Sequence, residues 1–316
     1  MKVGLIGVSH WHTGMYVNAL LKLGEDIIAI SDRNEELVKS LSRAIGCKYY
    51  TDYVEMVEDE ELDFVFSFGR HVDMPKIIGL LIKKGIPFLT EKPAGINHKE
   101  VLELARLAES KELFAGVAFA IRSSTWAQEV IESRNFIGDL NYLYFRYVTG
   151  PPTRYVSWRC PWMLKRDEAG GGCLINLGVH FIDLVYYLTG EEIELEASIV
   201  DNRNYKLEVE DYAVLMLRTK GGRTGVVEIA YTPSKKVETY YSLIGNKGIA
   251  VVRGREFILA NGERVLKKEL SNDHYFRFIR LTLEAYKKGR KPLATLSDMV
   301  RVLRIVNQAY ESVGKR

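Results

Sequence analysis

The tripeptide Glu91-Lys92-Pro93 contains residues whose types could take part in catalysis. It directly follows the apolar segment 87–90, which is typical of a short buried strand. A lysine in this position is commonly a solvated surface residue. Pro93, however, restricts the backbone beside it, so the amine of Lys92 could be held in one direction. A cationic amine held in this way donates strongly to a developing alkoxide, and Lys92 is therefore a candidate catalytic residue.

A second candidate group consists of polar residues at positions 176, 180, 183 and 187. Their spacing places Asn176, His180, Asp183 and Tyr187 on one face of a helix. Such a face is usually the solvated side. Gly178 lies within the pattern, where glycine costs about 1 kcal/mol relative to alanine, and this favours close approach by another group. The imidazole of His180, with an ordinary pKa of about 6.5, is suited to accept a proton.

A third candidate site is the loop Gly7-Val8-Ser9-His10-Trp11-His12, which follows the first predicted strand. A G-x-G-x-x-G sequence in this place binds a pyrophosphate at a helix N-terminus. Only the first glycine is present; Ser9 could donate to phosphates, whereas His12 is large for a helix-packing position. Two histidines at i and i+2 do not share a helical face, and no Cys or carboxylate nearby completes a ligand set, so we predict no metal site.

Asp32 ends the second predicted strand and could bind the adenosine ribose. Its carboxylate would accept from the ribose hydroxyls and repel a 2′-phosphate, which favours NAD over NADP. Arg33 could instead bind that phosphate, so NADP stays possible. The alternative role for Asp32 is a turn or a cap for the helix that follows.

The elements that would position these side chains fall into two groups. Short apolar strands alternate with amphipathic helices up to residue 120, at 3–6, 27–31, 64–68, 87–90 and 114–119. This alternation predicts a doubly wound parallel sheet, an α/β domain over 1–120. Longer strands with glycine turns follow at 140–148, 193–200, 212–218, 224–232, 239–244 and 249–252, and then helices at 274–288 and 296–312. They predict an α+β domain over 121–316 on an open, mainly antiparallel sheet.

Composition excludes several classes of protein. The formal net charge is +3 and the basic residues are scattered, which predicts no nucleic-acid partner. Cys47, Cys160 and Cys173 are widely spaced and suggest neither disulfides nor a zinc site, so we expect a cytoplasmic protein. The apolar runs at 3–8 and 77–82 are too short for a signal peptide or a membrane helix, and no membrane association is predicted.

The motifs, in this order, resemble those of the Gfo/Idh/MocA oxidoreductases. Glu91-Lys92-Pro93 is similar to the family's hallmark after a strand of its Rossmann domain, and residues 170–183 resemble its G-G-x-L-x-D/N-x-G-x-H-x-x-D block. Val209-Glu210-Asp211-Tyr212, Gly245-Asn246-Lys247-Gly248 and Ser297-Asp298 occupy the expected order. The resemblance covers nearly the whole chain. It implies a Rossmann domain, NAD(P) as cofactor, and a homo-oligomer, which an open sheet face also favours.

The resemblance also implies an activity and the residues that perform it. We expect hydride transfer between NAD(P) and a secondary alcohol or ketone of a sugar, polyol or sugar nucleotide. Lys92 would meet the substrate hydroxyl near the nicotinamide, and His180 would transfer the proton. The sequence departs from the family in its glycine loop, in Asn176 where many members have Asp, and in Met74 where His is common.

The predicted binding residues come from several segments. Residues 154–162 mix aromatic and basic side chains that could stack on a sugar ring and bind a carboxylate or phosphate, or could form a surface or oligomer contact. The predicted substrate contacts are Asn176, Arg122, Trp158, Arg159 and Asp183. The predicted cofactor contacts are Gly7, Ser9, His10, Trp11, His12, Asp32, Arg33, Phe68, Gly69, His71, Glu91 and Lys92.

Two other functions are compatible with these motifs. One is a glycosidase in which tightly held NAD oxidises the sugar transiently, so that free NADH does not accumulate. The other is a non-catalytic regulator that binds a dinucleotide and a partner protein. The presence of both Lys92 and His180 argues against the second.

Overall fold

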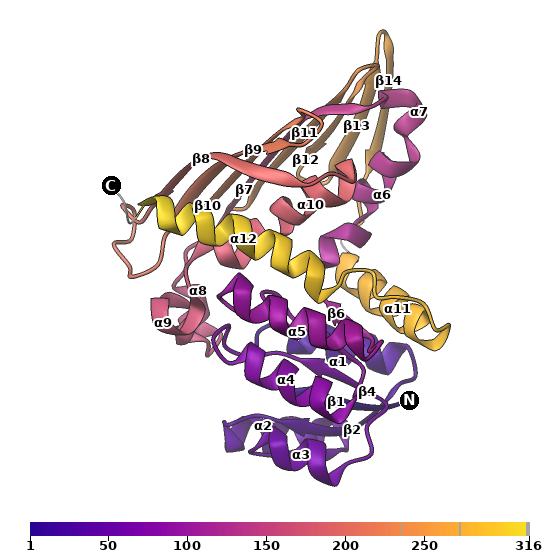
Figure 1. The fold of residues 1–316 in the computed structure, drawn as a ribbon, viewed down its shortest axis with the longest axis vertical. Helices are drawn as coiled ribbons and strands as arrows, with labels where there is room; N and C mark the ends of the chain where they lie inside the picture. The colour runs from indigo at the N-terminus through magenta and orange to yellow at the C-terminus, as the bar shows by residue number, and fades with distance from the viewer. Residues whose placement is uncertain (235, 272, 314–316) are drawn as a thin grey trace.

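The structure is a computed structural model that describes residues 1–234, 236–271 and 273–313. It confirms the predicted fold class: a parallel sheet with helices is followed by a second, mainly antiparallel sheet (Figure 1). The two sheets lie at opposite ends of the molecule. Figure 1 shows helices α10 and α12 between the second sheet and the N-terminal domain.

The N-terminal sheet has the strand order β3-β2-β1-β4-β5-β6, and every neighbouring pair is parallel. The order reverses between β1 and β4, and ligands of such sheets bind outside the carboxyl ends of the strands at this point. The elements are β1 (Lys2–Ile6), α1 (Thr13–Lys22), β2 (Asp26–Ser31), α2 (Glu35–Ile45), β3 (Lys48–Tyr50), α3 (Tyr53–Asp59), β4 (Phe64–Ser67), α4 (Met74–Lys84), β5 (Phe88–Thr90), α5 (His98–Ser110) and β6 (Ala115–Val117).

Most of the remaining elements belong to the second sheet or to the segment that links the two sheets. The sheet has the order β14-β13-β12-β11-β7-β10-β9-β8, in which only β7 and β10 pair in parallel among the described strands. The helical elements before β8 are η1 (Ala120–Ser123), α6 (Thr125–Glu132), α7 (Arg134–Ile137), α8 (Arg154–Ser157), η2 (Pro161–Leu164), α9 (Arg166–Ala169), the π-helix η3 (Leu174–Gly178) and α10 (Val179–Thr189). The strands are β7 (Leu140–Thr149), β8 (Ile193–Asp201), β9 (Tyr212–Thr219), β10 (Thr224–Tyr231), β11 (Glu238–Gly245), β12 (Ile249–Arg253), β13 (Glu256–Asn261) and β14 (Arg264–Glu269).

One face of the second sheet is covered by helices and the other is open. Inward residues of β7 such as Leu143 and Phe145 are fully buried, whereas Tyr142 on the other face is 58% exposed. Met216 of β9 and Ile244 of β11 share this open face, because their registers place them with the outward residues of β10 and β7. The sheet therefore exposes a broad, partly apolar surface.

The last two helices return to the N-terminal domain. Helix α11 (His274–Lys287) packs on α1, and its Phe278, Ile279 and Leu283 belong to the same buried cluster as Leu5 and other residues of the parallel sheet. Helix α12 (Leu296–Val313) packs on α5, β8 and α10. The predicted division of the chain at residue 120 is therefore incomplete, because α11 completes the core of the first domain.

The helical run Arg166–Thr189 is long and apolar enough to cross a membrane by length and composition alone. In the fold, 89% of its most apolar window is buried. It includes α10, which packs on β7, β10 and α12. This burial is typical of a core helix.

Candidate active site

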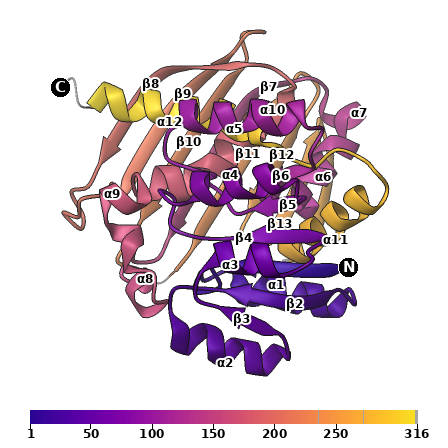
Figure 2. The same cartoon turned by 60° about the horizontal axis from the view of Figure 1, so that its bottom comes forward.

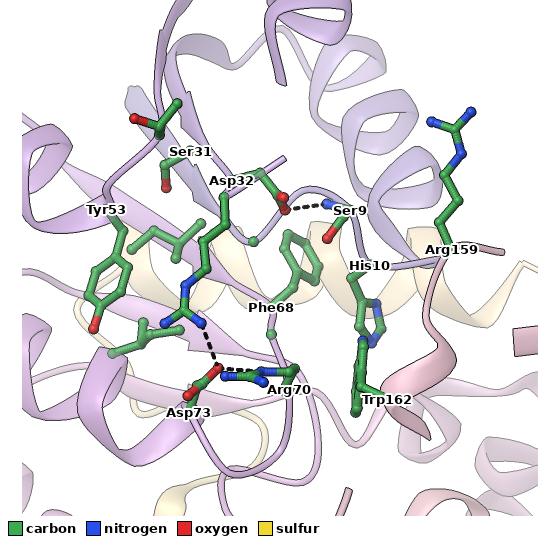
Figure 3. A pocket seen from close by; sticks show the side chains of 16 residues that line it. Ser9, His10, Ser31, Asp32, Tyr53, Phe68, Arg70, Asp73, Arg159 and Trp162 are labelled. Carbon is green, nitrogen blue, oxygen red and sulfur yellow. Dashed lines mark hydrogen bonds and ion pairs between the residues drawn. The ribbon is translucent and has the colours of Figure 1, made fainter. Parts of the chain in front are cut away.

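The loop after β1 forms one wall of a pocket at the carboxyl edge of the parallel sheet (Figure 3). Gly7 has φ +79°, and a Cβ added there would lie 2.3 Å from the carbonyl oxygen of Phe68, so only glycine fits. Of the predicted cofactor contacts, this pocket is lined by Gly7, Ser9, His10, Asp32, Arg33, Phe68 and Gly69.

Asp32 lies at the end of β2 with its carboxylate turned toward this loop. Its Oδ2 accepts from the Ser9 backbone N–H at 2.7 Å, and its Oδ1 accepts from the Asn34 N–H at 2.9 Å. The side chain that caps α2 is Asn34, which accepts from Leu37 N–H. Of the two alternatives for Asp32, the fold therefore contains the turn, formed by its bond to Asn34 N–H, whereas the helix cap is Asn34.

Three arginines line the same pocket, two of which have acidic partners. Arg70 pairs with Asp73 at 2.7 Å and with Glu168 at 2.6 Å, while Arg33 lies 3.7 Å from Asp73 (Figure 3). Arg159, from the segment between α8 and η2, lies at the edge of the pocket. This segment leaves the second sheet toward the N-terminal domain (Figure 2). Arg159 was predicted to bind substrate, but it lines this pocket at the edge of the parallel sheet. Arg70 was not predicted, although it lies three residues after the end of β4.

His12, which stands where the glycine-rich pattern has a small residue, contacts a buried carboxylate. Its Nδ1 lies 3.0 Å from Glu91 Oε1 and 3.0 Å from the Tyr275 hydroxyl, and Tyr16 donates to the same carboxylate at 2.8 Å. Burial alone raises the pKa of Glu91, but the charges of His12 and Lys92 outweigh it and hold this pKa well below its usual range. Glu91 lines neither cavity described here, so it supports the loop from behind.

Lys92 is buried and points at the segment that carries Asn176. Its Nζ donates to the backbone oxygen of Asn176 at 2.7 Å and lies 3.3 Å from Asn176 Oδ1. Burial lowers the pKa of Lys92 to about 8, although the charge of Glu91 opposes this shift. The amine therefore titrates near neutral pH.

Two tyrosines hold the Asn176 side chain in a fixed orientation. Asn176 Nδ2 donates to the Tyr155 hydroxyl at 2.6 Å and to the Tyr231 hydroxyl at 3.2 Å, which leaves Oδ1 for Lys92. Neither tyrosine was predicted as a site residue. Tyr155 lies within the aromatic segment 154–162, which could have indicated it. Tyr231 is buried at the end of β10, and no neighbouring residues in the sequence mark it as part of a site.

Close backbone packing explains the glycines before Asn176. A Cβ on Gly172 would lie 2.0 Å from the carbonyl oxygen of Glu210, and the Glu210 carboxylate accepts from Gly172 N–H at 2.7 Å and Leu174 N–H at 2.9 Å. The first turn after these residues is the π-helix η3. This arrangement places Asn176 and His180 on the same cavity.

His180 is buried beside Lys92 and lines that cavity. Burial and the charge of Lys92 hold the pKa of His180 well below its usual range, so its imidazole is neutral near pH 7. Its Nδ1 has no hydrogen-bond partner among the described residues. Asp183, which shares the predicted polar face of this helix, pairs with Arg122 instead.

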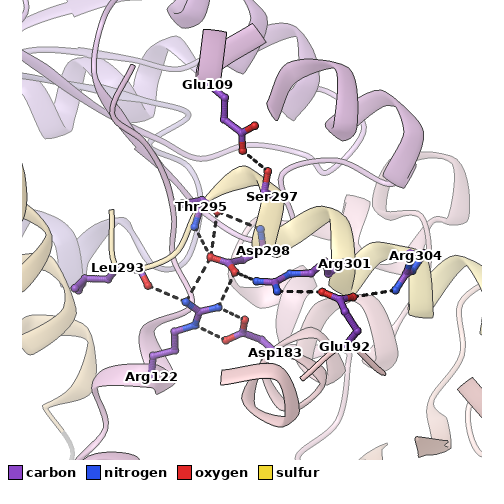
Figure 4. A network of polar contacts seen from close by, with 10 residues as sticks. All are labelled: Glu109, Arg122, Asp183, Glu192, Leu293, Thr295, Ser297, Asp298, Arg301 and Arg304. Carbon is purple, nitrogen blue, oxygen red and sulfur yellow. Dashed lines mark hydrogen bonds and ion pairs between the residues drawn. The ribbon is translucent and has the colours of Figure 1, made fainter. Parts of the chain in front are cut away.

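Arg122 and Asp183 form a buried ion pair away from the cavity (Figure 4). The distances are 2.8 Å from Nε and 2.5 Å from Nη2 to the two carboxylate oxygens, and Arg122 also donates to Leu293 O and approaches Asp298 at 3.4 Å. Neither residue lines the cavity, so this placement does not support their predicted contact with substrate. The polar helix face is buried rather than solvated.

The remaining predicted contacts have mixed positions. Trp11 and His12 line the cavity with Lys92, whereas Trp158 lines neither cavity, is 45% exposed, and has its ring centroid 6.4 Å from that of Trp11. His71 is buried behind both cavities, where its Nδ1 lies 2.7 Å from Ala169 O. Within residues 1–234, 236–271 and 273–313, no group of three or more His, Cys, Asp or Glu could hold a metal ion.

The cavity that contains Lys92 and His180 has a volume of about 610 Å³. It adjoins the dinucleotide pocket, because successive residues of one loop, His10 and Trp11, line the two spaces. This cavity is lined by Lys92, Asn176, His180 and His12. These residues belong to separate motifs of the sequence, so the sequence alone could only suggest that they lie together. The arrangement can hold an alcohol beside a bound dinucleotide and take its proton.

Family models match most of the chain. Residues 1–119 match a model described as an oxidoreductase family with an NAD-binding Rossmann fold, and residues 125–251 match the GFO/IDH/MocA C-terminal domain. Among curated proteins, trans-1,2-dihydrobenzene-1,2-diol dehydrogenase from Oryctolagus cuniculus is 27% identical, over 74% of this chain and 69% of that protein. Myo-inositol 2-dehydrogenase from Thermotoga maritima is 24% identical, over 100% of this chain and 97% of that protein.

Solved structures with a similar fold align with the whole length of the chain. The WlbA dehydrogenase from Bordetella pertussis, in complex with NADH and UDP-GlcNAcA, has a TM-score of 0.89 at 17% identity and covers 100% of this chain and 96% of its own. A levoglucosan dehydrogenase in complex with NADH and levoglucosan has a TM-score of 0.87 at 18% identity and covers 100% and 97%. At these identities the likeness establishes the fold.

Proposed function

Because the chain belongs to the Gfo/Idh/MocA family of NAD-binding oxidoreductases, we propose that it interconverts a secondary alcohol and its ketone. The alcohol belongs to a sugar, a polyol or a related cyclic compound. Relatives named for a dihydrobenzenediol and for myo-inositol support this range. The main support for the proposal is that Lys92, Asn176 and His180 line one cavity beside the dinucleotide pocket.

The pocket has the position and the lining expected of a dinucleotide site. The first glycine of such a loop makes a tight turn, and Gly7 does so with φ +79° and its backbone packed against the Phe68 carbonyl. Gly7 and Ser9 would hold the pyrophosphate, and Asp32 would accept from the adenosine ribose. NAD, when bound, supplies the carbon that accepts or donates hydride.

We assign the proton to Lys92, which differs from the sequence-based assignment to His180. A neutral amine has two N–H bonds and one lone pair. Asn176 O and Oδ1 lie where both N–H bonds can be accepted, so the lone pair stays free for a substrate hydroxyl. A base with a pKa of about 8 suits proton transfer near neutral pH, whereas His180 binds protons too weakly and instead orients the hydroxyl.

The test is a panel of sugars, sugar acids, polyols and cyclic diols, assayed by absorbance of the reduced cofactor. Reduced cofactor should appear with at least one member, and Lys92→Met should lower turnover by roughly 10²–10⁴-fold with cofactor affinity retained. The matched control is Lys84→Met at the exposed end of α4. Release of sugar from glycosides without accumulation of reduced cofactor would identify a glycosidase, and cofactor binding without any turnover would identify a regulator.

We further propose that the open face of the second sheet pairs with a second copy of the chain. Tyr142, Met216 and Ile244 expose between 41% and 58% of their surface on this face. An exposed apolar surface of this breadth is typical of a protein interface. A two-fold axis through the sheet would bury the same residues of both copies.

A further inference from the structure

Of the two tyrosines that contact Asn176, Tyr155 lines the cavity and Tyr231 does not. Both are buried, with 2% and 1% of their surface exposed. The amide nitrogen of Asn176 donates to the Tyr155 hydroxyl at 2.6 Å, and the oxygen of the same carboxamide lies 3.3 Å from Lys92 Nζ. The hydroxyl of Tyr155 and the amine of Lys92 therefore contact the two ends of one carboxamide, and both side chains line the same cavity.

The hydroxyl oxygen of Tyr155 already accepts two hydrogen bonds. Asn176 Nδ2 donates to it at 2.6 Å and Arg154 Nη2 donates at 3.2 Å. These two bonds use the accepting capacity of the oxygen, so the hydroxyl can bind a further group only by donating its hydrogen. The Tyr231 hydroxyl lies 3.5 Å away, at the outer limit for a hydrogen bond. The hydrogen of Tyr155 is thus available to a ligand oxygen in the cavity.

Arg154 places a positive charge beside this oxygen. Its guanidinium carbon lies 4.8 Å from the ring centroid of Tyr155 and 5.1 Å from that of Tyr231. Its other hydrogen-bond partners in the described part of the chain are the backbone oxygens of Gly150 and Pro151, so no carboxylate there neutralises it. Negative charge shifts onto a phenol oxygen when its hydrogen is donated, and a cation that donates to this oxygen strengthens that bond.

We propose that the Tyr155 hydroxyl donates a hydrogen bond to the reacting oxygen of the substrate, as a further catalytic residue. This inference rests on the proposed function. During oxidation the hydroxyl proton moves to Lys92, the hydride leaves the carbon for NAD, and the substrate oxygen carries negative charge until it becomes a carbonyl oxygen. Because Lys92 is neutral when this step begins, a fixed donor stabilises that charge. Tyr155 keeps its own proton, and in the reverse reaction it donates to the ketone oxygen.

The deciding experiment compares Tyr155→Phe with Tyr231→Phe, because each removes one acceptor of Asn176 Nδ2 and only Tyr155 lines the cavity. Oxidation of the panel alcohol that the native chain turns over fastest is measured at saturating NAD. Tyr155→Phe should lower kcat and kcat/KM by about 10²-fold, as expected when one fixed donor is removed. Tyr231→Phe should lower them by less than about tenfold, since it loses one neutral hydrogen bond. Equal losses would mean that Tyr155 acts only through Asn176, and would contradict the proposal.

Two further measurements separate donation from other roles of Tyr155. The rise of kcat/KM with pH near 8 should remain in Tyr155→Phe, because Lys92 stays the base; loss of this rise would make Tyr155 the base instead. Fluorescence titration with NAD, which needs no turnover, should give the native affinity, and a fall as large as that in kcat/KM would assign Tyr155 to cofactor binding.

Failure of this inference is distinct from failure of the proposed function. A native chain that oxidises a panel alcohol, with a Tyr155→Phe variant that is equally active, refutes the role of Tyr155 alone. A native chain that oxidises no member of the panel refutes the proposed function and, with it, this inference.

Discussion

At the scale of single residues, the contact between Lys92 and Asn176 decides how the site handles a proton. An amide at position 176 offers an oxygen to the amine without adding a negative charge. Many members of the family have Asp at this position, and a carboxylate there would stabilise the cationic form of Lys92. The departure at Asn176 therefore keeps Lys92 usable as a base near pH 8.

The first prediction concerns the pH dependence of alcohol oxidation. Only the neutral amine accepts a proton, so kcat/KM should rise with pH through an apparent pKa of about 8 and be lost progressively below it. His180→Ala should reduce turnover by roughly 10²-fold and keep this limb. A His180→Ala enzyme whose rate no longer depends on pH between 6 and 9 would return the role of base to His180.

The second prediction concerns Asn176→Asp. The new carboxylate would lie beside the cationic amine and raise the pKa of Lys92, so the rising limb should move to higher pH by about one unit or more. At pH 7 oxidation should then slow by about tenfold. The measurement is the pH profile of kcat/KM, with NAD affinity as the control. A limb that stays in place would show that Lys92 does not produce it.

The third prediction concerns the choice of cofactor. The Asp32 carboxylate lines the pocket, where it would repel a 2′-phosphate on the adenosine ribose, so NAD should bind about tenfold or more tightly than NADP. Asp32→Ser should narrow the difference, since it removes the negative charge near a 2′-phosphate. Fluorescence titration at physiological salt measures both affinities, and tighter binding of NADP by the native chain would refute the assignment.

At the scale of elements, an ion-pair network holds together the junction of η1, α10 and α12 (Figure 4). Arg122 of η1 pairs with Asp183 of α10 and approaches Asp298 of α12, and Arg301 continues the network from Asp298 to Glu192. The elements η1 and α10, which line the cavity through Ile121 and His180, are thus tied to α12. A misplaced α10 would displace His180, which lies one turn before Asp183.

The fourth prediction tests this junction. Asp183→Leu leaves a buried guanidinium without its main partner and should lower the free energy of unfolding by about 3–5 kcal/mol. The double variant Arg122→Met with Asp183→Leu should recover much of this loss, because no charge is left buried. Denaturant unfolding measures both. Glu103→Gln removes the exposed partner of Arg106 and is the control; an equally small effect of Asp183→Leu would mean that the network contributes little.

At the scale of the whole molecule, two surfaces of the second sheet perform different tasks. The inner face, with α10 against it, forms the core and one wall of the cavity. The outer face exposes apolar side chains across several strands. Since α12 packs on both α5 and β8, an oligomer formed through the outer face would hold the two active sites at fixed distances.

The fifth prediction is that the chain associates through this outer face. Tyr142→Arg combined with Met216→Glu should shift the species seen by sedimentation velocity from an oligomer to a monomer. Far-UV circular dichroism should remain unchanged, since both side chains point away from the core. A native chain that sediments as a monomer at micromolar concentration would refute the interface.

Much of the fold follows from local pattern. The six predicted strands from 140 to 252 match β7 to β12 within about one residue at each end, because alternation of buried and exposed side chains has the period of a strand. Strands β3, β13 and β14 were missed. Strand β3 has only three residues and all six residues of β14 are exposed, so neither has an alternation to detect, whereas β13 does alternate and was overlooked. Helix α11 was predicted as a helix, but its packing on the first domain was not, since periodicity identifies an apolar face and does not show which element covers it.

The sequence by itself determined the two-domain order, the glycine turn, and the lysine and histidine that face the cavity, because each depends on residues close together in the chain. Only the tertiary structure decided the partners: Glu91 for His12, the tyrosines for Asn176, and Asp183 for Arg122. These pairs are separated by up to 79 positions in the sequence. A polar side chain needs a hydrogen-bond partner once it is buried, but the packing of the whole chain determines which partner it contacts.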